Sequence, residues 1–347
     1  MPFCISPLKK CKSPPFSFFI ASNKLISVSD TGKQVTRKRS DMKKAIEVSN
    51  LFKQYGDATA VNNISFEVEQ GSLFAFLGEN GAGKSTTINM LSTILPKTSG
   101  QVRLMGDELG KEDDAIRKSI GIVFQNSVLD GNLTVKQNLL TRGAYYGYGK
   151  KEIMERLSLF WDEFNLEEIW NKRYENLSGG QRRRIDIARA LIHKPDILFL
   201  DEPTTGLDPM SRRMVWDYIN HLRKNENLTI FLTTHYMEET AEADNVVIMD
   251  KGNIIAEGSP AELKSRYTGK KLIWYTAQNE ENTKIIETSS APSFSYEADH
   301  YNILMDEGIM EFIWKNKDFI RDFEVIKGTM DDVFLTLTGK EMVECNG

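Results

Sequence analysis

Five short segments of this 347-residue chain are apolar on both sides and are separated by longer helical stretches. Strands that are buried on both faces occur in largely parallel sheets, which helices cover. The sequence between residues 45 and 267 therefore predicts an α/β domain built on such a sheet. The five predicted strands are residues 72–77, 120–124, 197–200, 229–232 and 246–249.

The last of these strands is followed by signals for a hairpin and a capped helix. Residues 250–253, with the sequence Asp-Lys-Gly-Asn, predict a turn into a short strand at residues 254–256. Ser259, Pro260 and Glu262 then have the spacing of a helix start, with Ser as the cap and Pro at the first helical position.

Beyond about residue 269 the pattern changes to short alternating segments, such as residues 271–276 and 310–314. This pattern predicts a small α+β domain at the C-terminal end. Its last predicted helix, which Gly339 ends, places three apolar side chains on one face, namely Val333, Phe334 and Leu337.

Residues 1–41 differ in composition from the rest of the chain. They contain eight Lys or Arg against two acids, and four of the ten prolines, without a sustained period. This composition predicts a disordered basic leader. One interpretation is that translation starts at Met42, and the alternatives are an organelle transit peptide or a basic tether to an anionic membrane. The predicted domains are then residues 42–268 and 269–347.

Charge and cysteine content exclude several classes of protein. A net charge of -5 gives no global basic field for a nucleic-acid partner. Cys4, Cys11 and Cys345 lie near the ends, so the body has no cysteines for a disulfide framework or a metal site, and a reducing compartment is expected. No segment approaches the roughly 20 apolar residues that a membrane-spanning helix needs. A secretory signal also fits poorly, because the short apolar patch after Pro15 lacks a clear cleavage site.

A glycine-rich segment directly follows the first predicted strand and precedes a predicted helix at residues 86–95. It matches the pattern G-x-x-x-x-G-K-[ST], in which backbone N–H groups surround a phosphate at a helix N-terminus. Lys84 is expected to reach the β and γ phosphates of a nucleotide, and Ser85 to bind Mg²⁺. The predicted phosphate-binding residues are Gly78, Glu79, Asn80, Gly81, Ala82, Gly83, Lys84, Ser85 and Thr86.

Two carboxylates, Asp201 and Glu202, follow the predicted strand at residues 197–200. Ligands of open α/β sheets bind at this carboxyl edge. Asp201 is expected to bind Mg²⁺ through water, and Glu202 to act as general base toward an attacking water. By itself, an apolar strand followed by two acids is mostly structural. Together with the phosphate loop, it is the expected second half of a nucleotide site.

The segment Leu-Ser-Gly-Gly-Gln at residues 177–181 precedes a long predicted helix at residues 182–192. Ser178 and Gln181 have the spacing of a capping box. Gly179 and Gly180 also expose N–H groups at a helix start, which makes a second anion site possible. Because one chain cannot easily bring both sites to one phosphate, a second copy is expected to supply this one.

Together with residues 203–208 and His235, these motifs resemble the nucleotide-binding subunit of an ABC transporter, over residues 45–267. The resemblance implies the fold class: a P-loop NTPase cassette with a largely parallel sheet core, an antiparallel β part and a helical subdomain. The cofactors that it implies are ATP and Mg²⁺.

The resemblance also implies roles for individual residues. Tyr55 would stack on adenine, Gln125 would sense Mg²⁺ and the attacking water, and His235 would contact the γ phosphate. Taken singly, these residues could be a core aromatic, a polar group at a strand end and a loop histidine. Two copies would close head to tail on ATP, with Lys84 of one chain facing Ser178 of the other and Asp208 near the interface.

Residues 182–193 and 331–339 resemble the ATP-binding subunits of ABC-2 type multidrug exporters of the daunorubicin-resistance group. This implies an ATPase at the cytoplasmic face of the membrane, as a homodimer or heterodimer on a separately encoded permease, with drug cargo. Related subunits handle lipids, polysaccharides, Na⁺ or peptides.

Two other functions are possible for such a chain. One is that of a soluble ABC-type ATPase acting on ribosomes or DNA, which the single copy of each motif disfavours. The other is that of a regulatory or dimerising module with slow turnover.

Three adjacent arginines, Arg182, Arg183 and Arg184, could suggest a nucleic-acid patch. A helix distributes consecutive residues around its circumference, so they cannot form one face. We expect them to serve interface and surface pairing instead, and no nucleic-acid partner is expected.

Aromatic and aliphatic side chains at nearly helical spacing are expected to pack within the helical subdomain, namely Trp161, Phe164, Leu166 and Trp170.

Overall fold

The computed structural model describes residues 43–288, 293–305 and 308–339. The predicted leader at residues 1–41 and the three cysteines lie outside these described residues. No helix within the described ranges is long and apolar enough to cross a membrane.

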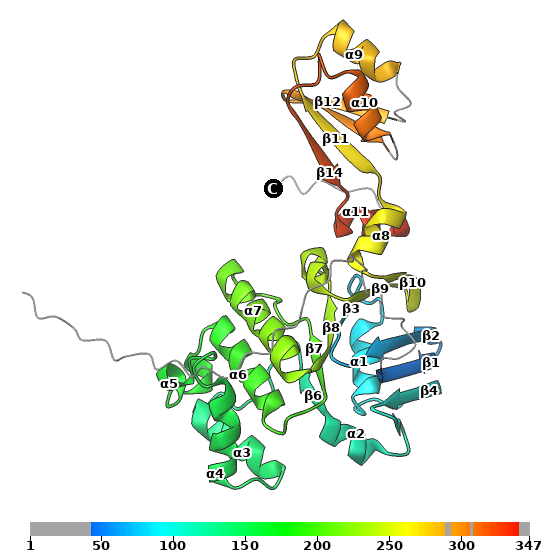
Figure 1. The fold of residues 1–347 in the computed structure, drawn as a ribbon. Coiled ribbons are helices and arrows are strands. Elements are labelled where there is room, and N and C mark those ends of the chain that lie inside the picture. The colour runs from blue at the N-terminus through cyan, green and yellow to red at the C-terminus, as the bar shows by residue number, and fades with distance from the viewer. Residues whose placement is uncertain (1–42, 289–292, 306–307, 340–347) are drawn as a thin grey trace, which may run out of the picture. The chain divides into compact units, whose positions relative to one another are not determined.

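The predicted parallel sheet is present, and its strand order is β10-β9-β3-β8-β7-β6 (Figure 1). All neighbouring pairs from β9 to β6 are parallel, and the predicted hairpin adds β10 as an antiparallel edge strand. The bounds are β3 Leu73–Leu77, β6 Ile120–Val123, β7 Ile197–Asp201, β8 Thr229–Thr234, β9 Asn245–Asp250 and β10 Asn253–Gly258.

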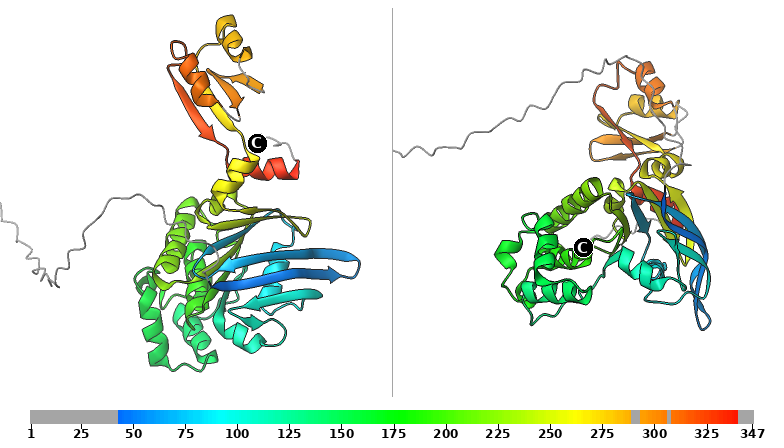
Figure 2. Two further views of the ribbon diagram at one scale, coloured as in Figure 1. Left: turned by 45° about the vertical axis from the view of Figure 1, so that its right-hand side comes forward. Right: turned by 60° about the horizontal axis from the view of Figure 1, so that its bottom comes forward.

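A second sheet, which is antiparallel, covers one face of the central sheet together with α1 (Figures 1 and 2). Four phenylalanine rings join the two sheets, since Phe66 of β2 stacks at 5.4 Å on Phe74 and also approaches Phe76 and Phe231. The elements are β1 Lys44–Tyr55, β2 Ala58–Glu69, α1 Lys84–Leu91, β4 Ser99–Leu104, β5 Asp107–Glu108 and α2 Asp113–Ser119.

Helices cover the other face of the central sheet. The predicted aromatic packing is confirmed, because Phe164 and Leu166 are fully buried and the rings of Trp161 and Trp170 lie 4.8 Å apart. The elements are α3 Val135–Tyr145, α4 Lys150–Leu157, η2 Ser158–Phe160, α5 Leu166–Ile169, η3 Tyr174–Asn176, α6 Gly179–Leu191 and α7 Pro209–Glu226, with η4 Met237–Glu242 between β8 and β9.

The C-terminal part contains a third, antiparallel sheet of order β12-β13-β11-β14, with its own core around Trp274 and Tyr301. The alternating segment at residues 310–314 is not a strand but lies in helix α10, since Ile309, Phe312 and Ile313 are buried at helical spacing. The elements are α8 Pro260–Tyr267, β11 Lys270–Tyr275, α9 Glu280–Glu287, β12 Ser293–Glu297, β13 His300–Met305, α10 Ile309–Lys315, β14 Phe323–Lys327 and α11 Met330–Thr338.

Helix α11 does not belong to the core of this third sheet. As predicted, Val333 and Phe334 share a buried face and Gly339 ends the helix in the left-handed conformation. That face, however, packs on α8 and η4 and forms part of the same core as the central sheet. The chain therefore leaves the cassette after α8 and returns to it at α11.

Candidate active site

The glycine-rich segment forms the predicted loop between β3 and α1. Gly81 and Gly83 have φ values of 86° and 105°, a region that favours glycine. A Cβ on Gly78 would lie 2.5 Å from the carbonyl oxygen of Met249, and a Cβ on Gly83 would lie 2.6 Å from that of Ala60. No side chain among the residues that the structure describes caps α1, so its first N–H groups remain available to an anion at the loop.

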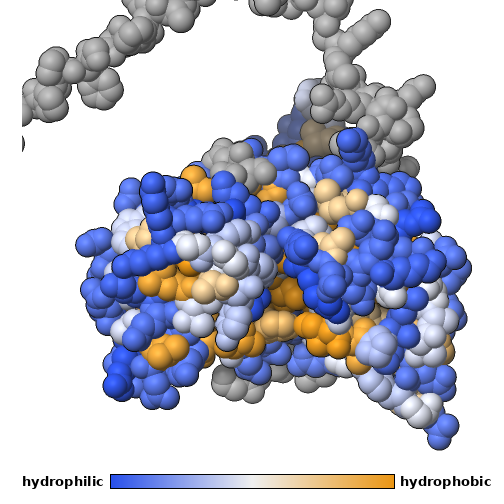
Figure 3. Space-filling model, turned by 90° about the horizontal axis from the view of Figure 1, so that it is seen from below, coloured by the Kyte–Doolittle hydropathy of each residue, from blue (hydrophilic) through white to orange (hydrophobic). Residues whose placement is uncertain are grey.

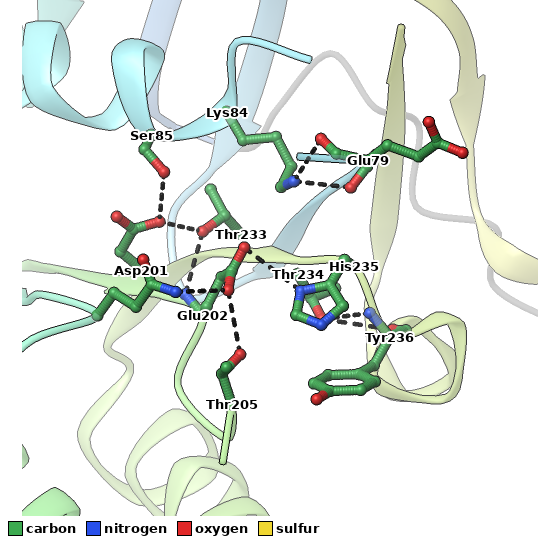
Figure 4. Close-up of polar contacts among 12 residues, drawn as sticks. Glu79, Lys84, Ser85, Asp201, Glu202, Thr205, Thr233, Thr234, His235 and Tyr236 are labelled. Carbon is green, nitrogen blue, oxygen red and sulfur yellow. Dashed lines mark hydrogen bonds and ion pairs between the residues drawn. The ribbon is translucent and has the colours of Figure 1, made fainter. Parts of the chain in front are cut away.

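Lys84 lies at the centre of this loop with only 4% of its surface exposed. Its Nζ donates to the carbonyl oxygens of Gly78 at 2.7 Å and Glu79 at 3.0 Å (Figure 4). Burial lowers the pKa of Lys84, and the nearby carboxylates of Glu202 and Asp201 oppose that shift. The loop thus presents a desolvated cation, which a phosphate group would stabilise.

Asp201 ends β7 opposite the start of α1. Its Oδ1 accepts hydrogen bonds from Ser85 Oγ at 3.1 Å and from Thr233 Oγ1 at 2.6 Å (Figure 4). A hydroxyl and a carboxylate side by side form an oxygen donor pair that suits Mg²⁺, which takes few protein ligands beside phosphates and water. The residues present therefore fit the metal.

Glu202 follows directly and is 8% exposed, with a left-handed φ of 44°. Its backbone N–H donates to both the carbonyl and the hydroxyl of Thr233 at 3.1 Å, which stabilises this strained conformation. The carboxylate accepts hydrogen bonds from Gln125 Nε2 and Thr205 Oγ1 at 3.1 Å, and His235 Nδ1 lies 3.3 Å away. The structure therefore brings together the predicted residues Gln125, Glu202 and His235.

Ser178 and Gln181 form the predicted capping box at the start of α6. Gly180 lies against Ser211, whose N–H donates to Asp208 Oδ1 at 2.9 Å, so that Asp208 caps α7. Hydrogen bonds from the side chain and then from the backbone N–H of Ser211 lower the pKa of Asp208. Helices α6 and α7 pack on one face of the central sheet and α1 packs on the other. The structure thus places the start of α6, which carries Ser178, beside the start of α7, which Asp208 caps, and on the opposite face of the sheet from the helix that follows the phosphate loop.

Tyr55 ends β1 with 48% of its surface exposed. The alternative of a core aromatic is therefore wrong for this residue. Lys53 Nζ lies 4.8 Å from the ring centroid. The exposed ring is free to stack on a planar ligand.

Arg183 is the site residue whose role the sequence did not reveal. It is 6% exposed, and it donates to the carbonyl oxygens of Phe124 at 2.5 Å, Asp201 at 2.9 Å and Pro203 at 2.6 Å. The expected surface pairing is therefore wrong for this arginine, which joins the segments that carry Gln125 and Glu202. Burial lowers its pKa. Its helical spacing to the apolar residues Ile187 and Ala190 was the available signal.

Replacing Arg183 with Ala should lower the free energy of unfolding by about 3 kcal/mol, because three carbonyl groups lose their donor in a buried region. Urea unfolding measures this change. Arg213→Ala is the matched control on the neighbouring helix α7, since Arg213 is exposed and a change under about 0.5 kcal/mol is expected. Equal losses in the two variants would contradict the bridging role of Arg183.

Comparisons with known proteins agree with this geometry. The family model described as ABC transporter matches residues 61–205. The chain is 36% identical to the daunorubicin/doxorubicin resistance ATP-binding protein DrrA of Streptomyces peucetius, over 85% of this chain and 93% of that protein. It is also 36% identical to the Nod factor export ATP-binding protein I of Rhizobium sp. (strain N33), over 86% of this chain and 99% of that protein.

Among solved structures, a dimeric ATP-binding cassette in a post-hydrolysis state, bound to ADP and Pi, is 25% identical. The TM-score is 0.57, and the match covers 62% of this chain and 98% of that one. The family match, the near full-length relatives and the arrangement of the site agree. The chain therefore belongs to the ABC transporter family, as one of its ATP-binding subunits.

Proposed function

We propose that this chain binds and hydrolyses ATP to drive an ABC-2 type exporter. The observation that carries the proposal is the position of Glu202, whose carboxylate lies among Gln125, Thr205 and His235 across from the phosphate loop. A buried carboxylate with this set of partners is suited to accept a proton from water that attacks a γ phosphate.

Each site residue has its own proposed role in ATP hydrolysis. The loop N–H groups and Lys84 bind the phosphates, and Ser85 and Asp201 would hold Mg²⁺. When bound, the metal neutralises charge on the β and γ phosphates. Glu202 takes the proton from the attacking water, Gln125 orients that water, and His235 contacts the γ phosphate. Tyr55 stacks on the adenine.

A second copy would complete each site. Ser178 and the phosphate loop lie on opposite faces of the central sheet, so a nucleotide on Lys84 meets the α6 N-terminus of another chain more readily than its own. The dimeric relative with ADP and Pi supports this assembly. ATP between two chains would pull them together, and loss of the γ phosphate would release them.

A groove on the surface of the cassette is a candidate binding site for the membrane partner. On the face that carries α2 and α3, apolar residues gather in the middle between hydrophilic regions (Figure 3). A groove of about 410 Å³ is lined by Ile94, Ile120, Tyr145, Tyr146, His193 and three arginines, which are Arg117, Arg142 and Arg189. We assign this groove to a segment of the permease, and we propose that the chain acts at the cytoplasmic face of the membrane.

The charges in the groove favour an acidic segment. The Nε atoms of Arg142 and Arg189 are buried and have no hydrogen-bond partner among the described residues. Burial lowers the pKa of His193 to about 4, so this ring is neutral near pH 7. Arg117 is paired with Asp114 at 2.6 Å, so the positive charge open to a partner comes from Arg142 and Arg189. A carboxylate on the permease segment would pair with them.

Purification from native membranes in mild detergent tests this proposal. The tagged chain should recover an integral membrane protein in stoichiometric amounts, and Arg142→Glu should reduce that recovery about tenfold or more, because like charges then meet. Lys151→Glu is the control, since Lys151 is exposed on α4 outside the groove. Recovery of ribosomal proteins or nucleic acid would instead favour a soluble mechanical ATPase.

The cargo is proposed from the relatives and from the C-terminal segment. One relative is named for daunorubicin and doxorubicin resistance and another for Nod factor export, at the same identity. We infer a drug-like cargo because residues 331–339 also resemble the drug-resistance group.

A further inference from the structure

Element η4 begins two residues after His235 and contacts two other parts of the site. Glu239 of η4 is 4% exposed and accepts a hydrogen bond from the buried Thr204, two residues after Glu202. Glu238 lies 3.8 Å from Arg212 in the first turn of α7. The position of η4 is therefore linked to the segments of both Glu202 and His235.

The Tyr236 ring adds a second link between these parts. It lies 4.1 Å from the His235 ring and 4.6 Å from the Arg212 guanidinium. His235 thus packs against the Tyr236 ring, which in turn packs against Arg212. Movement of η4 would move the histidine relative to Glu202, whose carboxylate lies 3.3 Å from it.

Helix α11 packs against η4 through an apolar cluster. Val333 is fully buried, and Phe334 and Met330 are 4% and 5% exposed. They belong to one core with Leu263 of α8 and with Met237 and Ala243, which lie at the two ends of η4. The cassette would therefore have a hole beside η4 if α11 were absent.

The connectivity of the chain links the contact between α11 and η4 to the C-terminal domain. The third sheet lies in sequence between α8 and α11 and has its own core. Both of its connections to the cassette thus run through helices that pack together and, in the case of α11, on η4. A partner that displaced the C-terminal domain would therefore act on α8 and α11, and through α11 on η4.

We propose that α11 is a positioning element that couples the C-terminal domain to the ATPase site, with Phe334 and Val333 as the residues that set η4. Through η4 they place His235 relative to Glu202. The proposal rests on the roles proposed above for those two residues. Residues 331–339 resemble the end of drug-exporter subunits. In this proposal they control the rate of ATP turnover and not the binding of the nucleotide.

The test is steady-state ATP hydrolysis by the full-length chain carrying Phe334→Ala. The expected result is a kcat about tenfold lower with an ATP KM that changes less than about twofold, because the phosphate loop is untouched while the catalytic geometry relaxes. The matched control is Phe312→Ala, which removes the same ring from the separate core of the C-terminal domain and should leave kcat unchanged.

Two further variants keep the test decisive if Phe334→Ala does not fold. Val333→Ala makes a smaller cavity and should lower kcat about threefold, and Phe334→Leu should restore most of the rate. A double-mutant cycle with Glu239→Gln should be non-additive in kcat, because both changes act through η4. Additive effects, or equal losses in the Phe334 and Phe312 variants, would overturn the coupling.

Glu202→Gln in the same assay distinguishes a failure of the proposed catalytic site from a failure of the proposed coupling. If it retains normal turnover, the proposed site has failed. If it abolishes turnover while α11 variants behave like Phe312→Ala, only the coupling has failed.

Discussion

Replacing Glu202 with Gln is expected to reduce ATP turnover by about 10²- to 10⁴-fold while ATP binding stays intact. A Gln side chain keeps an oxygen that can accept the hydrogen bond from Thr205, but it cannot take a proton from water. The phosphate loop and Lys84 are unchanged, so nucleotide should still bind. With the γ phosphate retained, the closed dimer should accumulate in Mg²⁺-ATP, which size-exclusion chromatography detects.

Glu67→Gln is a suitable control for that experiment. Glu67 is an exposed carboxylate of β2 that pairs with Lys44 at 2.5 Å. Its loss should leave both turnover and dimerisation unchanged. A normal rate of hydrolysis in the Glu202 variant would show that another group accepts the proton.

Replacing Lys84 with Ala should weaken ATP binding by about 10- to 100-fold. A hydrogen bond to a charged group contributes about 1.5–3 kcal/mol, and each 1.4 kcal/mol changes affinity tenfold. The effect should fall on binding as well as on turnover, because Lys84 would contact the phosphates before and during hydrolysis. Titration calorimetry with ATP measures the change.

Lys118→Ala serves as the control for Lys84, since Lys118 is an exposed cation of α2 and its loss changes the net charge equally. ATP affinity should stay within about twofold. An unchanged affinity in the Lys84 variant would mean that its bonds to the Gly78 and Glu79 carbonyls are structural and that other groups bind the phosphates.

The central sheet and its hairpin could be predicted from the sequence because their strands are short, doubly buried apolar runs. The caps of α6 and α8 were also predictable, since a capping box is a local pattern of Ser with Gln or Glu three residues later. The antiparallel sheet followed only from the family resemblance. The alternation at residues 310–314 indicated the wrong element, because helical packing of Phe312 and Ile313 on the third sheet outweighs a five-residue pattern.

At the site, motifs predicted which residues would be near the nucleotide but not how they are positioned. The left-handed backbone of Glu202 depends on Thr233, which lies 31 residues later. The bonds of Arg183 reach two separate segments, at Phe124 and at residues 201–203, and its neighbours in sequence suggested a surface role. The docking of α11 on η4 joins residues about 90 positions apart. Contacts of this kind are set by tertiary packing, which local patterns do not report.

The placement of Ser178 and the phosphate loop on opposite faces of the central sheet has a genetic consequence. In a head-to-tail pair, one chain carrying Lys84→Ala and another carrying Ser178→Ala would combine both defects at a single nucleotide site. The other site would draw its lysine and its serine from the two undamaged halves. Two alleles that are each inactive alone would then complement each other when expressed in one cell.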